Sequence, residues 1–189
     1  MVSTSKKRDA LVLLSGGIDS TACVEFYVSK RCSVGSLFLD YGQLAAAKEA
    51  SAAKAISSHY NIPLKIVKCK GLGPWTKGPI LGRNAFFLQT ALMCFRGESG
   101  IIAIGIHSGT AYRDCTDGFV KAMQSTFDLY ADGLISIGAP FIRWMKKDIW
   151  EYSKKKNVPV HLTYSCELGR KQPCGECLSC KDLEILYAG

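Results

Sequence analysis

Hydrophobic residues along the chain gather in short runs that alternate with longer stretches of helical periodicity. The short runs are rich in Val, Ile and Leu, and they predict strands at residues 10–14, 36–39, 64–68, 101–104 and 134–137. The longer stretches predict helices at residues 20–29, 43–59, 84–96, 119–130 and 146–156. Strand and helix therefore alternate through residue 156, and such alternation is typical of an α/β fold.

The predicted strands are nearly continuous apolar runs, which indicates that both faces of their sheet are covered. The sequence thus predicts a doubly wound, mostly parallel, five-stranded sheet with helices on both faces, formed by residues 1–158. A cysteine-rich tail, residues 159–189, follows as a small appendage. The glycine-rich joint over residues 69–83 is long for a connection in a compact domain, so it is the candidate for a mobile active-site loop.

Composition and charge restrict the class of protein less than the pattern of strands and helices does. The net charge of +8 favours anionic partners such as nucleotides, nucleic acid or an acidic protein, without choosing among them. No apolar run is long enough to span a membrane, and the N-terminus lacks the pattern of a secretory signal. Five of the nine cysteines lie in or beside predicted core elements, which favours a cytoplasmic protein with reduced thiols.

The segment SGGIDS, residues 15–20, stands where the first strand meets the first helix. Gly16 and Gly17 allow backbone angles closed to other residues, so several N–H groups can point at one spot, and the following helix adds its own. The turn suits a phosphate or pyrophosphate, with Asp19 placed to help hold a metal ion bound to it. On these residues alone, an ordinary tight turn with Asp19 or Ser20 as helix N-cap is an equal alternative.

Four cysteines in the tail have the spacing of a metal site. Seven residues separate Cys166 from Cys174, and two two-residue gaps lead on to Cys177 and Cys180. Four thiolates in one short segment predict one tetrahedral zinc ion per chain, which is structural because no coordination position stays open. An iron–sulfur cluster is the competing interpretation.

Residues 15–20 match the pyrophosphate loop of the ATP pyrophosphatase superfamily, whose members cleave ATP between its α and β phosphates. Together with the four-cysteine tail, they make nearly the whole chain resemble the 7-cyano-7-deazaguanine synthase (QueC) family. Further segments that resemble this family are LDYGQ from residue 39, GRN from residue 82 and AYRDC from residue 111. A lysine six residues after Pro140, here Lys146, also follows the family pattern.

The resemblance implies an ATP-dependent carbon–nitrogen ligase. ATP would activate the carboxylate of 7-carboxy-7-deazaguanine, ammonia would displace AMP to form the amide, and a second ATP would lead to 7-cyano-7-deazaguanine. It also implies magnesium with the ATP, and a homodimer. The implied site residues are, for ATP binding, Leu14, Ser15, Gly16, Gly17, Asp19, Ser20 and Arg83; for catalysis, Asp19, Arg83, Asp114 and Lys146; and for substrate binding, Tyr41, Gln43, Asn84, His107 and Tyr112.

The sequence departs from the family pattern around the predicted acceptor site. Leu44 and Ala45 replace an Arg–His pair, Arg113 replaces a proline, and the segments 69–83 and 105–115 are shorter. These departures leave open a QueC-like relative, of the kind thought to serve anti-phage systems, that joins the adenylated acid to a protein amine.

Two other classes of protein are less favoured. A zinc-bearing nucleic-acid-binding module would have aromatic and basic residues interleaved in the tail, and this tail lacks them. A tRNA sulfur-transfer enzyme of the same superfamily would need a reactive cysteine near the glycine turn, for which Cys23 is the candidate.

Overall fold

The structure, a computed structural model, describes residues 7–73, 75, 79–110 and 112–188. Five parallel strands form one sheet in the order β3-β2-β1-β4-β5. The strands are β1 (Asp9–Leu13), β2 (Ser33–Asp40), β3 (Leu64–Lys68), β4 (Gly100–Ala103) and β5 (Ile135–Gly138). Each predicted strand is present, and the expected doubly wound parallel sheet is confirmed.

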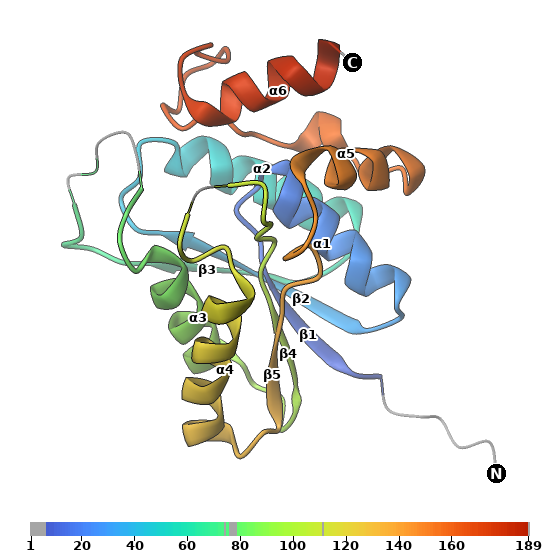
Figure 1. Ribbon diagram of the computed structural model, residues 1–189, viewed down its shortest axis with the longest axis vertical. Helices are drawn as coiled ribbons and strands as arrows, with labels where there is room; N and C mark the ends of the chain where they lie inside the picture. Colours follow the sequence, from blue (N-terminus) through green and yellow to red (C-terminus); the bar gives the residue numbers. More distant parts are fainter. Residues whose placement is uncertain (1–6, 74, 76–78, 111, 189) are drawn as a thin grey trace.

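Helices connect and cover the strands (Figure 1). They are α1 (Ile18–Ser29), α2 (Ala46–His59), α3 (Arg83–Cys94), α4 (Asp117–Ala131), α5 (Lys146–Lys155), the short 3-10 helix η1 (Val160–Leu162) and α6 (Leu178–Ala188). The sequence pattern predicts α1 to α5 but not η1 or α6. The predicted start of α2, residue 43, is three residues too early. The Gln43 side chain forms hydrogen bonds with the backbone of Tyr41 and Leu39, so Gln43 belongs to the turn before the helix.

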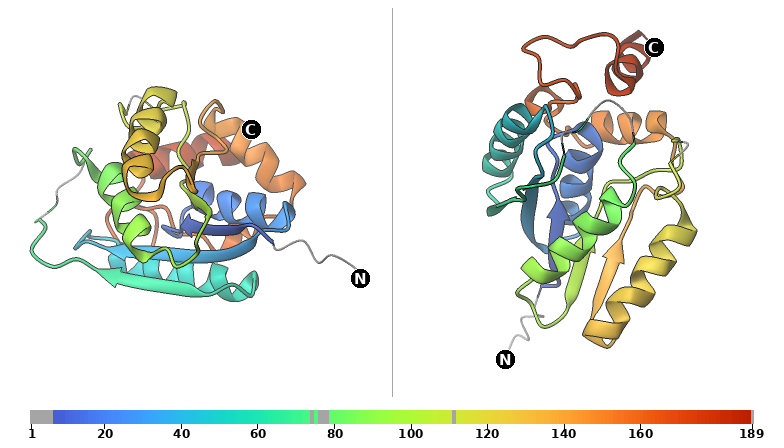
Figure 2. Two further views of the ribbon diagram at one scale, coloured as in Figure 1. Left: turned by 90° about the horizontal axis from the view of Figure 1, so that it is seen from below. Right: turned by 90° about the vertical axis from the view of Figure 1, so that its left-hand side faces the viewer.

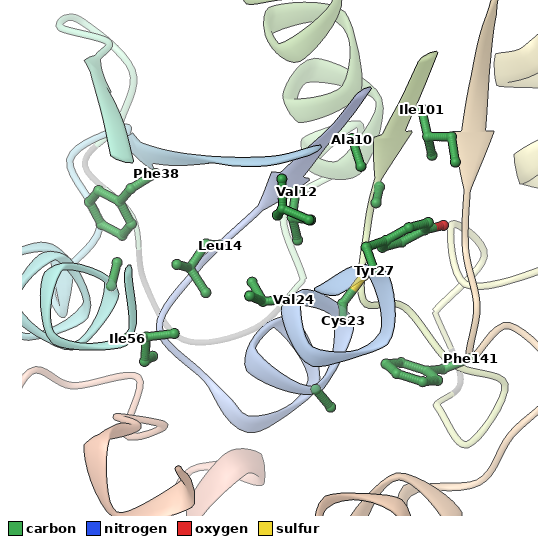
Figure 3. Close-up of a cluster of buried hydrophobic side chains, with 14 of the residues drawn as sticks. Ala10, Val12, Leu14, Cys23, Val24, Tyr27, Phe38, Ile56, Ile101 and Phe141 are labelled. Atoms are coloured by element: carbon green, nitrogen blue, oxygen red, sulfur yellow. The ribbon is translucent and has the colours of Figure 1, made fainter. Parts of the chain in front are cut away.

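One face of the sheet packs on α1, α2 and α5. Val12 of β1 and Leu14, just past the strand, meet Val24 of α1 and Ile56 of α2 in a single apolar cluster (Figure 3). Phe141, which precedes α5, is fully buried in the same cluster. Burying an apolar side chain of this size contributes roughly 1.5–3 kcal/mol, so this cluster holds the first turn of α1 firmly against the sheet.

The other face packs on α3 and α4. Leu13, whose side chain points opposite to those of its neighbours in β1, contacts a cluster that includes Leu88 of α3 and Phe127 of α4. Since successive residues of a strand face opposite sides, β1 supplies both cores. This explains why its sequence is apolar without alternation.

The C-terminal tail lies beyond the carboxyl ends of the strands, while the start of β1 lies at the opposite end of the sheet (Figures 1 and 2). The N–H of Tyr164 donates to the Gly16 carbonyl at 2.8 Å. Gly169, at φ +67°, lies directly against the Leu44 carbonyl and leaves no space there for a Cβ. The tail is thus attached to the turns that follow β1 and β2. A domain boundary at residue 158 stays a prediction.

None of the helices in the described part of the chain combines the length and the apolar character needed to cross a membrane.

Candidate active site and metal centre

A pocket of about 620 Å³ opens at the carboxyl ends of β1, β2 and β4. The strand order changes direction between β1 and β4, and in open α/β sheets such switch points hold the ligand. The predicted residues that line the pocket are Leu14, Ser15, Gly17, Asp19, Ser20, Tyr41, Gln43, Arg83, Asn84, His107, Tyr112, Asp114 and Lys146. The tail adds further lining residues, among them Glu167 and Ser179.

Gly16 lies behind the pocket wall, and its position demands glycine for two reasons. Its φ is +87°, a left-handed conformation that other residues adopt at a cost. A Cβ here would also approach the Glu49 carbonyl to 2.7 Å and the Ala52 Cβ to 3.0 Å. Gly16 therefore lets the turn after β1 pack against the first turns of α2.

Gly17 has a different role, because its φ of −85° is open to any residue. The expectation that both glycines need unusual backbone angles holds for Gly16 alone. Gly17 is the N-cap of α1 and has no side chain to cap with, so the prediction of Asp19 or Ser20 as N-cap is wrong. A Cβ on Gly17 would fill the space near the Ser15 hydroxyl, the Tyr164 carbonyl and the Ser165 hydroxyl, on the pocket side.

Two serine hydroxyls border this space. The Ser15 hydroxyl donates to that of Ser20 at 3.1 Å, and the Ser20 hydroxyl donates to the Gly17 carbonyl at 2.9 Å. The N–H groups of the first turn of α1 point out of the helix at the same place, where its dipole favours negative charge. The turn is therefore built to receive an anionic group.

Asp19 is paired across the pocket with Lys146, at the start of α5. The Lys146 ammonium lies 2.6 Å from each carboxylate oxygen, and about a quarter of each side chain is exposed. The Nε2 of His107 lies 3.8 Å from one of those oxygens. Residues from the ends of α1, β4 and α5 thus meet at the anion site.

His107 is almost fully buried, and burial lowers the pKa of its imidazole below the ordinary value. The Asp19 carboxylate acts in the opposite direction, and the Lys146 ammonium adds to the lowering. The Nδ1 atom accepts a hydrogen bond from the Gly109 N–H at 3.2 Å. In the neutral ring the proton is consequently on Nε2, which faces Asp19. His107 thus brings a donor to the carboxylate without adding charge.

The turn after β2 is organised by the Gln43 side chain. Its Oε1 accepts from the Tyr41 N–H at 2.9 Å, and its Nε2 donates to the Leu39 carbonyl at 3.1 Å. The same Nε2 donates to Glu49 Oε2 at 2.7 Å. Both Nε2 hydrogens and the amide oxygen are therefore used within the protein.

The start of α3 brings Arg83 and Asn84 to the pocket, after Gly82 reverses the chain at φ +76°. The Arg83 guanidinium lies 5.9 Å from the Phe87 ring, and its buried Nε has no hydrogen-bond partner among the described residues. Asn84 is buried, and its amide donates to the Asp114 carbonyl at 3.5 Å. Arg83 is thus a cation placed at the pocket, while Asn84 ties α3 to the loop that carries Asp114.

Trp75, Glu49 and Glu167 are among the pocket residues to which the sequence analysis assigned no role. Trp75 lies in the predicted mobile joint, and its Nε1 donates to the Tyr41 carbonyl at 2.9 Å; residues 74 and 76–78 of that joint lie outside the described residues. Glu49 lies in the first turn of α2. Glu167 accepts hydrogen bonds from the N–H and hydroxyl of Ser179, so it caps the start of α6. No local motif marks these residues, since each reaches the pocket through tertiary packing.

The four tail cysteines converge. The sulfur atoms of Cys166, Cys174, Cys177 and Cys180 all lie within 4.8 Å of one another, and the pair from Cys174 and Cys180 is 3.8 Å apart. Zinc–sulfur bonds of about 2.3 Å in a tetrahedron place the sulfurs roughly 3.8 Å apart, so the cluster has the size for one metal ion.

Neighbouring backbone N–H groups favour the thiolate form of Cys174. Backbone N–H groups of Cys177 and Glu176 point at its sulfur and lower its pKa to about 6. The N–H of Cys177 lies 3.4 Å from that sulfur. A thiolate is the form that binds metal, and a metal would complete a cluster whose buried core consists of cysteine side chains.

Cys23 faces the hydrophobic core between α1 and the sheet. It is fully buried, and desolvation raises the pKa of its thiol far above the ordinary range. A thiol in this environment is inert, so it does not supply the reactive cysteine that a sulfur-transfer enzyme would need.

Known proteins resemble this chain along nearly its whole length. A family model described as "Queuosine biosynthesis protein QueC" matches residues 9–81 and 77–184. The 7-cyano-7-deazaguanine synthase of Oceanobacillus iheyensis is 32% identical over 94% of this chain and 91% of the relative. The enzyme of the same name from Aquifex aeolicus is 31% identical over 97% of this chain and 99% of the relative.

Solved structures share the fold at low sequence identity. The U34-tRNA thiolase NcsA from Methanococcus maripaludis, solved with its 4Fe–4S cluster, has a TM-score of 0.57 and 14% identity, over 97% of this chain and 66% of its own. A 4-thiouridine synthetase, solved as an RNA complex with bound ATP, has a TM-score of 0.51 and 16% identity, over 96% of this chain and 50% of its own. These likenesses place the sheet among adenine nucleotide α-hydrolase-like folds.

Proposed function

The chain belongs to the QueC family of ATP-dependent ligases, and from that premise we propose that it uses ATP and ammonia to convert 7-carboxy-7-deazaguanine to 7-cyano-7-deazaguanine. The observation that carries the proposal is a single pocket in which the SGGIDS turn meets two cations, Arg83 and Lys146, from distant parts of the chain. An acyl adenylate forms when a carboxylate oxygen attacks the α-phosphate and pyrophosphate leaves. Such a step needs charge neutralisation and alignment more than covalent help.

Each part of the pocket has a task in this reaction. The turn of Ser15, Gly17 and Ser20 binds the departing pyrophosphate, and Lys146 and Arg83 offset the charge that develops on the phosphates. Asp19 and Asp114 offer the carboxylate oxygens that magnesium prefers. The magnesium ion, when bound with ATP, supplies further neutralisation of phosphate charge.

The rest of the pocket receives the acid and the amine. Tyr41 and Tyr112 border the space for the deazaguanine ring, and His107, neutral and next to Asp19, borders the anion site. Ammonia then attacks the acyl carbon and AMP leaves, which gives the amide. Activation of the amide oxygen by a second ATP and loss of AMP leave the nitrile.

We assign the tail cysteines to a structural zinc ion. Four protein ligands leave no open position, and a 4Fe–4S cluster is larger than one ion, so its four cysteine sulfurs stand farther apart than they do here. The tail packs on the turns after β1 and β2, so its metal supports one wall of the pocket. A homodimer and a cytoplasmic location stay predictions from the family and from the cysteines.

One incubation tests the function. The purified protein, with ATP, magnesium, ammonium and 7-carboxy-7-deazaguanine, is expected to yield AMP and the nitrile, identified by mass spectrometry. Asp19→Asn is expected to abolish AMP release, and Glu98→Gln, an exposed change at the opposite end of the sheet, to leave it intact. Release of amide alone, or a mass gain on added protein, would favour the relative that joins the acid to a protein amine. Absence of AMP would overturn the proposal.

A further inference from the structure

Glu49 presents a carboxylate oxygen to the pocket. Its Oε2 accepts from Gln43, while its Oε1 accepts no hydrogen bond from any residue that the structure describes. The backbone carbonyl of Glu49 lies close to Gly16, where an added Cβ would approach it to 2.7 Å, so the first turn of α2 packs directly on the turn after β1. A carboxylate is therefore held at a defined place beside the pyrophosphate turn.

Gln43 appears at first as a pocket-lining side chain, yet its bonding makes it a positioning residue. Its amide is anchored to the backbone at Tyr41 and Leu39, and the remaining N–H is aimed at Glu49. The anchored amide fixes the orientation of the carboxylate. Rigid orientation is what recognition of a planar ligand edge requires.

The space beside Glu49 is walled by aromatic rings. The Tyr41 ring centroid lies 5.2 Å from that of Phe87 and 6.1 Å from that of Trp75, and all three residues line the pocket. Arg83 carries its charge to the same wall, close enough to influence the ionisation of Tyr41. Flat aromatic faces with one oriented carboxylate suit a heterocyclic base that has donors along one edge.

The two bases in the reaction differ along that edge. Deazaguanine offers two donors side by side, the ring N1–H and the 2-amino group, whereas adenine offers an amino group next to an acceptor nitrogen. Burial raises the pKa of the Glu49 carboxyl, whereas the Gln43 hydrogen bond and the Arg83 charge act in the opposite direction and favour the ionised form. An ionised carboxylate only accepts hydrogen bonds, so it matches the deazaguanine edge and not the adenine edge. On the premise of the proposed function, we propose that Glu49, positioned by Gln43, binds the N1–H and 2-amino edge of the deazaguanine acid and so selects this substrate.

Other pocket carboxylates are less suited to this task. Asp19 is paired with Lys146 at the anion site, and Glu167 uses its Oε1 to cap α6 through Ser179. Asp182 is exposed on α6, at the rim. Asp114 is half-buried like Glu49, but the proposed function assigns it to magnesium. Glu49 combines partial burial, an orientation set by Gln43 and an oxygen that accepts no hydrogen bond from the described residues.

The test compares two acids, 7-carboxy-7-deazaguanine and its analogue without the 2-amino group. Binding is measured by titration calorimetry without ATP, and kcat/KM by AMP release. The wild type is expected to prefer the aminated acid by on the order of 100-fold, because the analogue leaves an acceptor position of the half-buried Glu49 carboxylate unpaired. Glu49→Gln is expected to reduce this preference at least ten-fold and to leave the KM for ATP unchanged. Gln43→Leu keeps the Glu49 carboxylate but removes the hydrogen bond that orients it. The preference for the aminated acid is therefore expected to fall less than in Glu49→Gln.

Glu98→Gln is the matched control, since the same change falls on an exposed residue outside the pocket. Equal losses for both acids in the Glu49 variant, or a selective rise in the KM for ammonium, would overturn the assignment of Glu49. If the wild type binds neither acid and releases no AMP, the proposed function itself fails, so the two failures are distinct.

Discussion

The SGGIDS turn, residues 15–20, and the cysteine tail are held in place by different means. The turn joins β1 to α1. Val12 and Leu14 before the turn and Val24 after it are buried in the main hydrophobic core, which anchors both ends of the turn. The tail has a small core of its own, in which the buried residues are Cys166, Cys177 and Cys180. The main core thus preorganises the turn, whereas the tail, on the proposed assignment of its cysteines to zinc, would need the metal to reach a comparable order.

The comparison teaches how a short chain builds a pocket. One wall comes from the sheet and is present as soon as the sheet folds. Another wall comes from the tail, with Glu167 and Ser179 at the pocket, and on the proposed zinc assignment it would depend on the metal. We therefore expect changes at the turn to affect the whole protein, and changes at the tail to act locally.

The largest effect is expected at Gly16. Gly16→Ala puts a side chain in a left-handed conformation, which costs about 1–2 kcal/mol, and drives its Cβ against the Glu49 carbonyl. The midpoint temperature of thermal unfolding should fall, and AMP release should be lost. Gly17→Ala is the matched variant: its backbone angles are ordinary, so only the poorer N-cap should lower stability, by about 0.5–1 kcal/mol, while ATP binds more weakly. Equal loss of stability in the two variants would contradict this account.

The next effect concerns the ion pair between Asp19 and Lys146. Lys146→Met keeps the length of the side chain but removes the charge, and AMP release should fall on the order of 100-fold, mainly in kcat. Lys147→Met changes the neighbouring exposed lysine and should leave turnover unaltered. Similar turnover for both variants would show that the ion pair has no part in the reaction.

A smaller and more local effect is expected at Cys177. Cys177→Ser removes a buried ligand, so metal analysis should show the zinc content falling from one per chain toward zero. Hydrogen exchange should rise over residues 164–187 while β1 and β4 stay protected, and AMP release should fall roughly ten-fold. Cys32→Ser, outside the cluster, is the control. Exchange that rises through the whole sheet would show that the tail is not a separate unit of stability.

The smallest effect is a pH dependence from His107. Because burial lowers its pKa, the folded protein binds fewer protons than the unfolded chain just below the ordinary value of about 6.5. This contribution to stability is present above that pH and is lost as the pH falls through the folded pKa. In urea unfolding, the free energy of unfolding should fall less steeply with decreasing pH for His107→Asn than for the wild type. His161→Asn, at an exposed site, should follow the wild type, and identical slopes for all three proteins would refute the assignment.

Much of the fold was open to prediction because its signals are local. The apolar runs and the helical periodicity located all five strands and the first five helices, and the spacing of four cysteines indicated their cluster. Helix α6 escaped because its exposed Leu178, Ile185 and Tyr187 do not form a regular apolar stripe. The left-handed angle at Gly16, and its absence at Gly17, depends on how the turn packs on α2.

The sequence by itself determined the order of strands and helices, the glycine turn and the cluster of four tail cysteines, because each depends on residues that are close neighbours in the chain. Tertiary structure alone decided which distant residues meet: Lys146 with Asp19, 127 residues apart, and Glu49 with the aromatic wall at Tyr41 and Trp75. The physical reason is that the strand order β3-β2-β1-β4-β5 brings the ends of β1, β2 and β4 to one edge of the sheet. No local pattern encodes that long-range pairing, although the chemistry of the pocket depends on it.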